Sequence, residues 1–428
     1  MTATRAVRRA FVKFGLTGFD QGLSSLSNVI ASILAARLLP ASQFGVFGIV
    51  VASYLVCLML IRAFAGDGLL ATAGHGTESR SISVAVWNAL GAGVVASVLL
   101  ALGALLLRGQ LGSALAVLAI AMPGLALQDV GRYVGFQRSK PGIALLSDGV
   151  WLLLMLAAVP FAAAAPSAWL VTALWAGSGV VAGLTPLRWL RVRRLSAAEY
   201  REWRAEHGRS IVSIFFDQLS VSASQQGAVY LIAALVGLLG NAAYRGAQVI
   251  LGPMNVFTMG LNVVAVPHLR RRWLRYPDRL ASRAAAIGLS AAVVVTIITQ
   301  SLAFLPDPIG RLVLGETWRL SHPLLPWLGL LFTGQSLNFA AIAGLRVMGR
   351  ADRGLWVRLG VVPVTLTAVG IAAASSGVLA VVITQSACSL AAGIAWWTTF
   401  LTTARSESRR RGGGAAAAVS TLNLGAES

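Results

Sequence analysis

The chain is built from long apolar runs of membrane-spanning length, separated by short polar segments. A helix that crosses a bilayer needs about 20 predominantly apolar residues. By that criterion the sequence predicts twelve spanning helices. Their approximate bounds are 14–39, 45–65, 82–107, 111–131, 142–165, 168–190, 210–237, 243–266, 281–305, 323–345, 355–374 and 377–402. We therefore predict an all-α polytopic membrane protein.

A stripe of polar residues interrupts the first of these helices and appears again in the seventh. Five positions match at one constant offset and lie on the same helical face. The matching pairs are Phe19 and Phe216, Asp20 and Asp217, Gln21 and Gln218, Ser27 and Ser224, and Asn28 and Gln225. We interpret the pattern as an internal duplication. The alternative is a pair of unrelated helices that each tolerate an aspartate.

The duplication predicts two lobes of six helices each, joined by an arginine-rich connector. An even number of spans in each repeat relates the halves by a pseudo-twofold axis along the membrane normal, which suits alternating access. The predicted parts are a basic N-terminus over 1–13, an N-lobe over 14–190, a cytoplasmic linker over 191–209, a C-lobe over 210–402 and a disordered cytoplasmic tail over 403–428.

Positively charged residues support this arrangement. The chain has 35 Lys and Arg residues against 15 Asp and Glu, and all but six of the basic residues fall in segments that would be cytoplasmic if the N-terminus is inside. The exceptions are Arg37, Arg62, Arg108, Arg245, Arg311 and Arg319. The sequence therefore predicts a multi-pass protein with both termini cytoplasmic. Its arginine-rich, alanine-rich composition favours a bacterial plasma membrane.

Four aspartates fall near the cytoplasmic ends of predicted helices. A carboxylate at membrane depth costs several kcal/mol unless it faces a cavity or a partner. Asp20, Asp217 and Asp148 are therefore candidates for coupling to a proton or sodium gradient. The alternative for all three is interhelical hydrogen bonding or neutralisation of a nearby arginine. We interpret Asp129 as a structural partner of Arg132, one turn later.

Two arginines within apolar runs, Arg62 and Arg245, are candidates for binding an anionic substrate. The planar guanidinium binds two phosphate oxygens at once. The alternative is that each side chain extends to the lipid headgroups. Asn28 and Gln225, on the two polar stripes, are candidate contacts for a polar substrate.

Several kinds of chemistry are not indicated. The sequence contains no Gly-rich phosphate loop that ends in Gly-Lys-Ser/Thr and no His-Glu-x-x-His, and its four histidines lie in separate loops. The two cysteines have neither metal-ligand nor disulfide spacing. We predict no catalytic residues, no metal and no cofactor. The net charge of +20 lies in short clusters between apolar runs, so no nucleic-acid partner is predicted.

Short motifs along the first half carry a family resemblance. They are Phe19-Asp20-Gln21, Ala36-Arg37-Leu38-Leu39-Pro40, Gln43-Phe44-Gly45-Val46-Phe47, Ile61-Arg62-Ala63, Leu127-Gln128-Asp129, Arg138-Ser139-Lys140-Pro141 and Asp148-Gly149-Val150-Trp151. With them, most of residues 14–402 resembles the Wzx-like polysaccharide flippases of the multidrug/oligosaccharidyl-lipid/polysaccharide exporter (MOP) superfamily. The second half carries the pattern more weakly, at Asn241 to Arg245.

The resemblance implies a fold of two lobes around a V-shaped cavity and an ion-coupled flippase for an undecaprenyl pyrophosphate-type oligosaccharide. Arg62 would then contact phosphate, and Asp20 and Asp217 would couple transport to an ion. The expected partners are the lipid-linked oligosaccharide, membrane lipids, and the glycosyltransferases and polymerase of the same pathway. The alternatives are a drug or cation antiporter of the same fold, a polytopic membrane enzyme of polysaccharide assembly, and a non-transporting scaffold.

Overall fold

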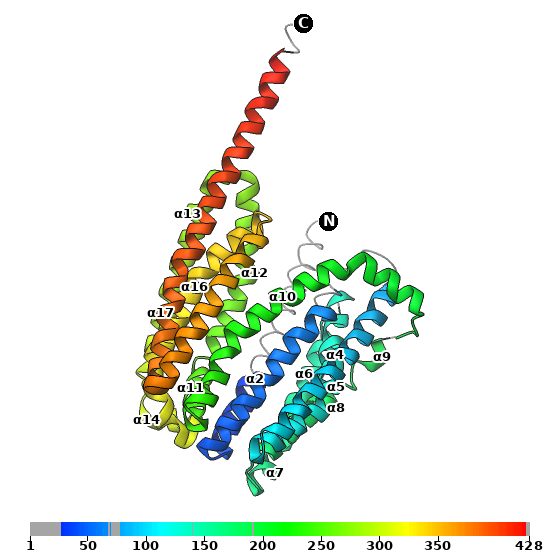
Figure 1. Cartoon of the computed structure of the whole chain (residues 1–428), viewed down its shortest axis with the longest axis vertical. Coiled ribbons are helices and arrows are strands. Elements are labelled where there is room, and N and C mark those ends of the chain that lie inside the picture. The colour runs from blue at the N-terminus through cyan, green and yellow to red at the C-terminus, as the bar shows by residue number, and fades with distance from the viewer. Residues whose placement is uncertain (1–26, 67–68, 70–77, 139, 191, 425–428) are drawn as a thin grey trace, which may run out of the picture. The chain divides into compact units, whose positions relative to one another are not determined.

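A computed structural model describes residues 27–66, 69, 78–138, 140–190 and 192–424 (Figure 1). Regular structure in these residues is helical throughout. Seven of the described helices are long and apolar enough to cross a membrane. The protein is a polytopic all-α membrane protein, as predicted.

The first half of the chain forms a series of helices that alternate with short turns (Figure 1). They are a helix at Ser27–Leu38, α2 (Ala41–Phe64), α4 (Glu78–Leu106), α5 (Gly109–Gln137), α6 (Gly142–Ala157), α7 (Val159–Ala164), α8 (Ala168–Ala182) and α9 (Leu187–Leu190).

The second half continues the series. Its helices are α10 (Ala197–Leu235), α11 (Leu238–Ile250), α12 (Pro253–Arg275), α13 (Leu280–Ala303), α14 (Asp307–Leu314), α15 (Trp318–Ser321), α16 (Leu325–Val347) and α17 (Ala351–Leu424). Three 3₁₀ turns lie at Pro277–Arg279, Gly315–Thr317 and His322–Leu324.

Helix ends differ from the predicted bounds where local chemistry outweighs hydropathy. The predicted eighth helix is divided into α11 and α12, because Pro253 begins a new helix and has no N–H to continue the old one. α17 contains a break at Gly377, whose φ of 78° is accessible to glycine at little cost. The break falls between the predicted eleventh and twelfth helices.

The C-terminal segment also differs from the expectation. Helical backbone extends to Leu424, through most of the segment that we predicted to be disordered. The run of four alanines from Ala415 favours helix, whereas the three glycines directly before it disfavour helix.

The chain divides into two compact units. Unit 1 comprises residues up to Val249 together with 306–322 and 373–378, and unit 2 comprises the remainder. In unit 1, α4 packs on α5, α5 packs on α8, and α10 packs along α2. The predicted relation between residues 14–190 and 210–402 stays a prediction.

Unit 2 has its own apolar core. The long helices α13 and α16 pack together, and α12 packs on α16. Leu269, Trp273, Phe400 and a row of small alanines on α16 fill the centre of this core. Unit 2 is therefore a tightly packed helical body.

Close approach of α2 to α11 within unit 1 depends on glycine. A Cβ atom at Gly45 would lie 2.1 Å from the carbonyl oxygen of Leu238. Asn241, which is fully buried, donates from Nδ2 to the carbonyl oxygen of Gly45 at 2.8 Å. This contact positions α11, and with it Arg245, against α2.

Candidate functional site

Arg62, in the last turn of α2, forms a two-point ion pair with Asp129 of α5. Its Nε donates to Oδ2 of Asp129 at 2.9 Å and its Nη2 donates to Oδ1 at 2.6 Å. The Arg62 side chain is 28% exposed, whereas that of Asp129 is 3% exposed. The guanidinium also lies 5.8 Å from the centre of the Tyr133 ring. The positive charge of Arg62 is therefore partly exposed at the surface of unit 1, and the negative charge of Asp129 is buried beneath it.

Arg132 extends this ion pair into the interior. Its Nη1 lies 3.6 Å from Oδ1 of Asp129 and its Nη2 lies 3.2 Å from Oδ2 of Asp148, on α6. We call Arg62, Asp129, Arg132 and Asp148 the four-charge cluster. Its formal charges cancel, which is how a protein keeps ionised groups away from water.

Neutral side chains complete the surroundings of Asp148. Nε2 of Gln128 donates to Oδ1 of Asp148 at 3.0 Å and to Oγ of Ser147 at 3.1 Å. Oγ of Ser147 donates to the carbonyl oxygen of Ala182, on α8, at 3.2 Å. The cluster therefore joins α2, α5, α6 and α8 through polar contacts.

These contacts bear on the predicted roles. The pairing of Asp129 with Arg132 is confirmed, although Arg62 is the nearer partner of Asp129. Asp148, a candidate for ion coupling, pairs with Arg132. Arg62 and Asp148 are thus brought into one cluster. Asp148 has the neutralising contact that the sequence left open as an alternative, whereas Arg62, for which the alternative was extension to the lipid headgroups, pairs with Asp129. Their roles in coupling and substrate binding stay predictions.

Arg245 has a different environment. Its Nη2 donates to Oγ of Ser32 at 3.1 Å, and its Nη1 donates to Oε1 of Gln248 at 3.4 Å. Nε of Arg245 is buried and has no hydrogen-bond partner among the described residues. A Cβ atom at Gly48 would lie 3.4 Å from Cβ and Cγ of Arg245, so the base of the side chain packs against α2.

No described carboxylate forms an ion pair with Arg245. The contrast with the four-charge cluster is clear, because there each arginine has an aspartate partner. Among the residues that the structure describes, the hydrogen-bonding partners of the Arg245 guanidinium are therefore neutral.

The remaining candidates belong neither to the four-charge cluster nor to the side chains that accept hydrogen bonds from Arg245 in the described part of the chain. Asn28 is exposed on the helix at Ser27–Leu38, and its backbone oxygen accepts from Oγ of Ser32 at 2.9 Å. Asp217 is half-buried and Gln225 is exposed, both on α10. Asp20 lies outside the described residues, as do most of the residues of the first polar stripe.

Sequence reasoning missed Gln128, Ser32 and Gln248 as parts of these sites. Gln128 could have been found, because it precedes Asp129 in an apolar run and lies one turn before Arg132. Ser32 and Gln248 carry no comparable signal, since isolated serine and glutamine residues in helices are common.

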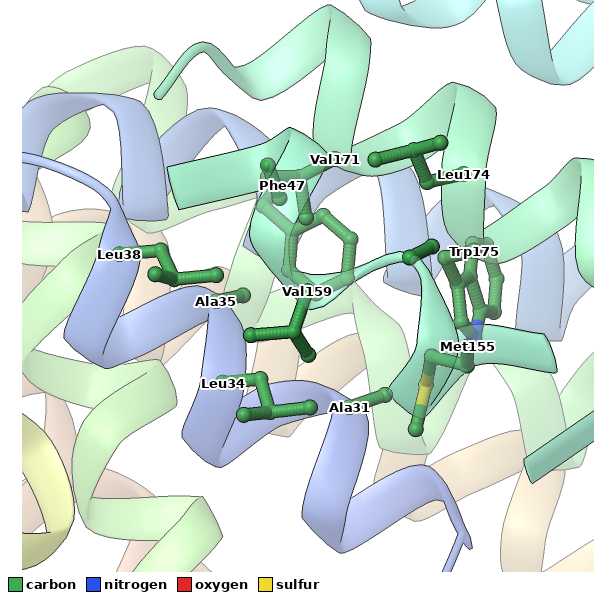
Figure 2. A pocket seen from close by; sticks show the side chains of 12 residues that line it. Ala31, Leu34, Ala35, Leu38, Phe47, Met155, Val159, Val171, Leu174 and Trp175 are labelled. Carbon is green, nitrogen blue, oxygen red and sulfur yellow. The ribbon is translucent and has the colours of Figure 1, made fainter. Parts of the chain in front are cut away.

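An apolar pocket lies among the helix at Ser27–Leu38, α2, α6, α7 and α8 (Figure 2). Leu34, Phe47, Met155 and Trp175 are among its twelve lining residues, all of which are apolar. The pocket offers no group that could bind a charge. No group of three or more His, Cys, Asp or Glu residues within the described part of the chain could hold a metal ion.

No protein-family model matches the sequence, and a search of curated proteins found no match. Solved structures do match. An inward-facing multidrug resistance MATE family transporter of the MOP superfamily is 14% identical, with a TM-score of 0.64, over 90% of this chain and 96% of that chain. The lipid II flippase MurJ, in an inward closed conformation, is 10% identical, with a TM-score of 0.67, over 90% of this chain and 87% of that chain.

A third similar structure is a MOP superfamily transporter from Pyrococcus furiosus. It is 15% identical, with a TM-score of 0.58, over 94% of this chain and 95% of that chain. All three matches cover nearly the whole length of both chains. The chain therefore has the fold of the MOP superfamily transporters.

Proposed function

We propose that this protein is a flippase that moves a lipid-linked oligosaccharide of the undecaprenyl pyrophosphate type across the bacterial plasma membrane for polysaccharide biosynthesis. The observation that carries the proposal is Arg245, whose charge has no carboxylate partner among the described residues. A partly buried cation whose described hydrogen-bond partners are all neutral favours an anionic ligand, because the ligand would supply a countercharge.

The chemistry of Arg245 suits a pyrophosphate. A guanidinium presents several N–H donors in a fixed plane and binds phosphate oxygens in pairs. Nε has no acceptor among the described residues, while Ser32 and Gln248 accept weak hydrogen bonds from the two terminal nitrogens. A phosphate could take up Nε and replace one of those neutral partners. Asn28, exposed on the same helix as Ser32, could bind a sugar hydroxyl.

Arg62 would be a second phosphate contact only after an exchange of partners. Its Nε and Nη2 are both engaged by Asp129. A phosphate that approaches from the exposed side of Arg62 would have to displace this carboxylate, which Arg132 could then hold alone. Arg62 would therefore bind substrate in only part of the transport cycle.

Transport would proceed by alternating access coupled to an ion, with Asp20, Asp217 and Asp148 as the coupling candidates. The partners would be the lipid-linked oligosaccharide, membrane lipids, and the glycosyltransferases and polymerase of the pathway. Both termini would be cytoplasmic, and no catalytic step on the substrate is involved.

A drug or cation antiporter of the same fold is the second candidate. The similarity to a MATE family transporter favours it. A cationic drug, however, needs a carboxylate that is not already neutralised. The two most deeply buried aspartates described in unit 1, Asp129 and Asp148, both have arginine partners. The charges of the described residues therefore favour an anionic substrate over a cationic one.

Complementation tests the proposal. The gene is expressed in a bacterial strain that lacks its polysaccharide flippase, and surface polysaccharide is measured alongside resistance to cationic drugs. We expect restored polysaccharide with the native chain, loss with Arg245→Ala and partial activity with Arg245→Lys, since an ammonium cannot replace the planar fork.

The matched control is Arg319→Ala, which removes an exposed arginine that makes no ion pair with a described residue. It should leave polysaccharide export intact, with membrane levels checked by immunoblot. Full activity of Arg245→Ala would contradict the proposal, as would drug resistance without any polysaccharide export.

A further inference from the structure

The first turns of α10 form a docked, amphipathic segment that the transport proposal does not use. The start of the helix is fixed by a reciprocal cap, in which the Glu199 N–H donates to Oγ of Ser196 at 3.2 Å and the Ser196 N–H donates to Oε2 of Glu199 at 2.9 Å. Figure 1 shows that α10 curves along its length. The segment is thus a defined structural element.

One side of this segment is packed against unit 1. Trp203 is 6% exposed and contacts Val84 of α4, with Phe64 of α2 beside them. The Tyr200 hydroxyl donates to Oδ1 of Asn88, on α4, at 3.0 Å. The aromatic side of the helix therefore faces inward, and its orientation about its own axis is set.

Two of the three acidic residues of the segment have arginine partners outside the helix. Oε1 of Glu199 lies 2.8 Å from Nη2 of Arg193, and Oε2 of Glu202 lies 3.0 Å from Nη2 of Arg80. The third, Glu206, lies beside the imidazole of His207, with Oε2 3.6 Å from Nδ1. Glu199 and Glu202 are therefore already paired with arginines other than those of the helix.

Arg201, Arg204 and Arg209 remain, and we call them the arginine face. All three are exposed, and none forms an ion pair with a described residue. At about 100° per residue each lies at least about 100° around the helix from Trp203. The three charges therefore point away from the docked side.

The position of the arginine face along α10 matches the depth of lipid headgroups. The apolar part of α10 begins at Ile211, directly after Arg209 and Ser210. At about 1.5 Å per residue, Arg204 lies about 7.5 Å and Arg201 about 12 Å further along the helix from Arg209. The headgroup layer on each side of the hydrocarbon core is about 5–7.5 Å thick, so Arg209 and Arg204 match its depth, and the long side chain of Arg201 can extend back toward it.

We propose that the arginine face binds the headgroups of anionic phospholipids in the cytoplasmic leaflet. The occupant is a lipid rather than a free phosphate, because the next two turns of the same helix expose the apolar side chains of Val212 and Phe216, which acyl chains could cover. Juxtamembrane arginines are attracted to anionic leaflets in an additive way. The site would anchor α10 to the membrane surface, and it does not depend on which substrate is transported.

Lipid titrations of the purified full-length protein in detergent test this site. Thermal stabilisation is measured against added phosphatidylglycerol, phosphatidylcholine and inorganic phosphate. We expect saturable stabilisation by phosphatidylglycerol alone. The variant R201Q/R204Q/R209Q should raise the half-saturating lipid concentration by about tenfold or more. The variant R201K/R204K/R209K should keep most of the effect, because charge rather than geometry attracts the lipid.

The matched control is R37Q/R108Q/R319Q, which removes three exposed arginines that lie outside the predicted cytoplasmic segments. It should change the half-saturating concentration by less than about threefold, since those arginines lie at three separate places along the chain and form no common face. Equal effects of the two glutamine variants would overturn the proposal by showing a general charge effect. Stabilisation by phosphatidylcholine, or by inorganic phosphate at similar concentration, would also overturn it. None of these readouts depends on transport.

Discussion

The charge pairing in the four-charge cluster predicts how far the free energy of unfolding falls when one of its charges is removed. Arg132 is 8% exposed and lies between two carboxylates, at 3.6 Å from Asp129 and 3.2 Å from Asp148. Two unit charges 3.2 Å apart attract each other by about 5 kcal/mol at an effective dielectric constant of about 20. Removal of one partner loses that attraction and leaves the other charge buried, which costs about 3–5 kcal/mol.

The perturbation is a double-mutant cycle of Asp148→Leu and Arg132→Leu. The first change leaves the cluster with a net charge of +1, and the second leaves it with −1. The double variant is neutral again and keeps the Arg62–Asp129 pair. We expect each single change to lower the free energy of unfolding by about 3–5 kcal/mol. The double variant should be more stable than the sum of the two losses predicts, by at least about 2 kcal/mol.

The assay is reversible unfolding of the purified protein in mixed micelles, with thermal melting as a second readout. Asp148→Leu combined with Phe400→Ala, in the core of unit 2, is the control. Those two changes should be additive to within about 0.5 kcal/mol, because the residues lie in different packed bodies. Additive losses in the Asp148–Arg132 cycle would refute the view that the two charges neutralise each other.

Three further outcomes are expected. Gly45→Ala should destabilise the protein by about 1–3 kcal/mol in thermal melting, because its Cβ would meet a backbone oxygen at 2.1 Å, whereas Gly91→Ala, with nothing within 4 Å, should have no such effect. Hydrogen bonds from the Ser196 backbone N–H and from Arg193 hold the pKa of Glu199 at about 2. The stabilisation by Glu199 is therefore complete above about pH 4.3 and lost as the pH falls toward 2, so the stability difference between the native chain and Glu199→Gln should vanish over that range. The double variant Asp20→Asn, Asp217→Asn should abolish ion-coupled transport in vesicles while membrane levels stay normal; full coupled activity would show that these carboxylates are structural.

Hydropathy alone predicted the polytopic helical architecture, because the cost of exposing backbone to lipid permits little other than helices. It did not predict the division between α11 and α12, since the apolar run continues through Pro253 and hydropathy ignores the missing N–H. Hydropathy also predicted that the seventh helix begins at residue 210, whereas α10 begins at Ala197. The cap at Ser196 and Glu199 is readable in the sequence as Ser-x-x-Glu, but its polar surroundings fall outside an apolar window.

The charged residues of the candidate site were identified from the sequence, but their pairing was only partly identified. Asp129 and Arg132 are three residues apart, so helical geometry alone indicates the contact. Arg62 and Asp129 are 67 residues apart, and their ion pair depends on how α2 packs against α5. For the same reason the sequence could not show that Arg62 has an acidic partner, whereas the partners of Arg245 among the described residues are neutral.

We propose that Arg245 binds the pyrophosphate of a lipid-linked oligosaccharide. The most direct test of this proposal is a flipping assay in vesicles reconstituted with the purified protein, in which a fluorescent undecaprenyl pyrophosphate-linked sugar and a cationic dye are followed in parallel. We expect translocation of the lipid-linked sugar by the native chain and by Arg319→Ala, a loss of at least about tenfold with Arg245→Ala, and no transport of the dye. Transport of the dye by the native chain, together with unchanged translocation of the lipid-linked sugar by Arg245→Ala, would contradict the proposed role of Arg245.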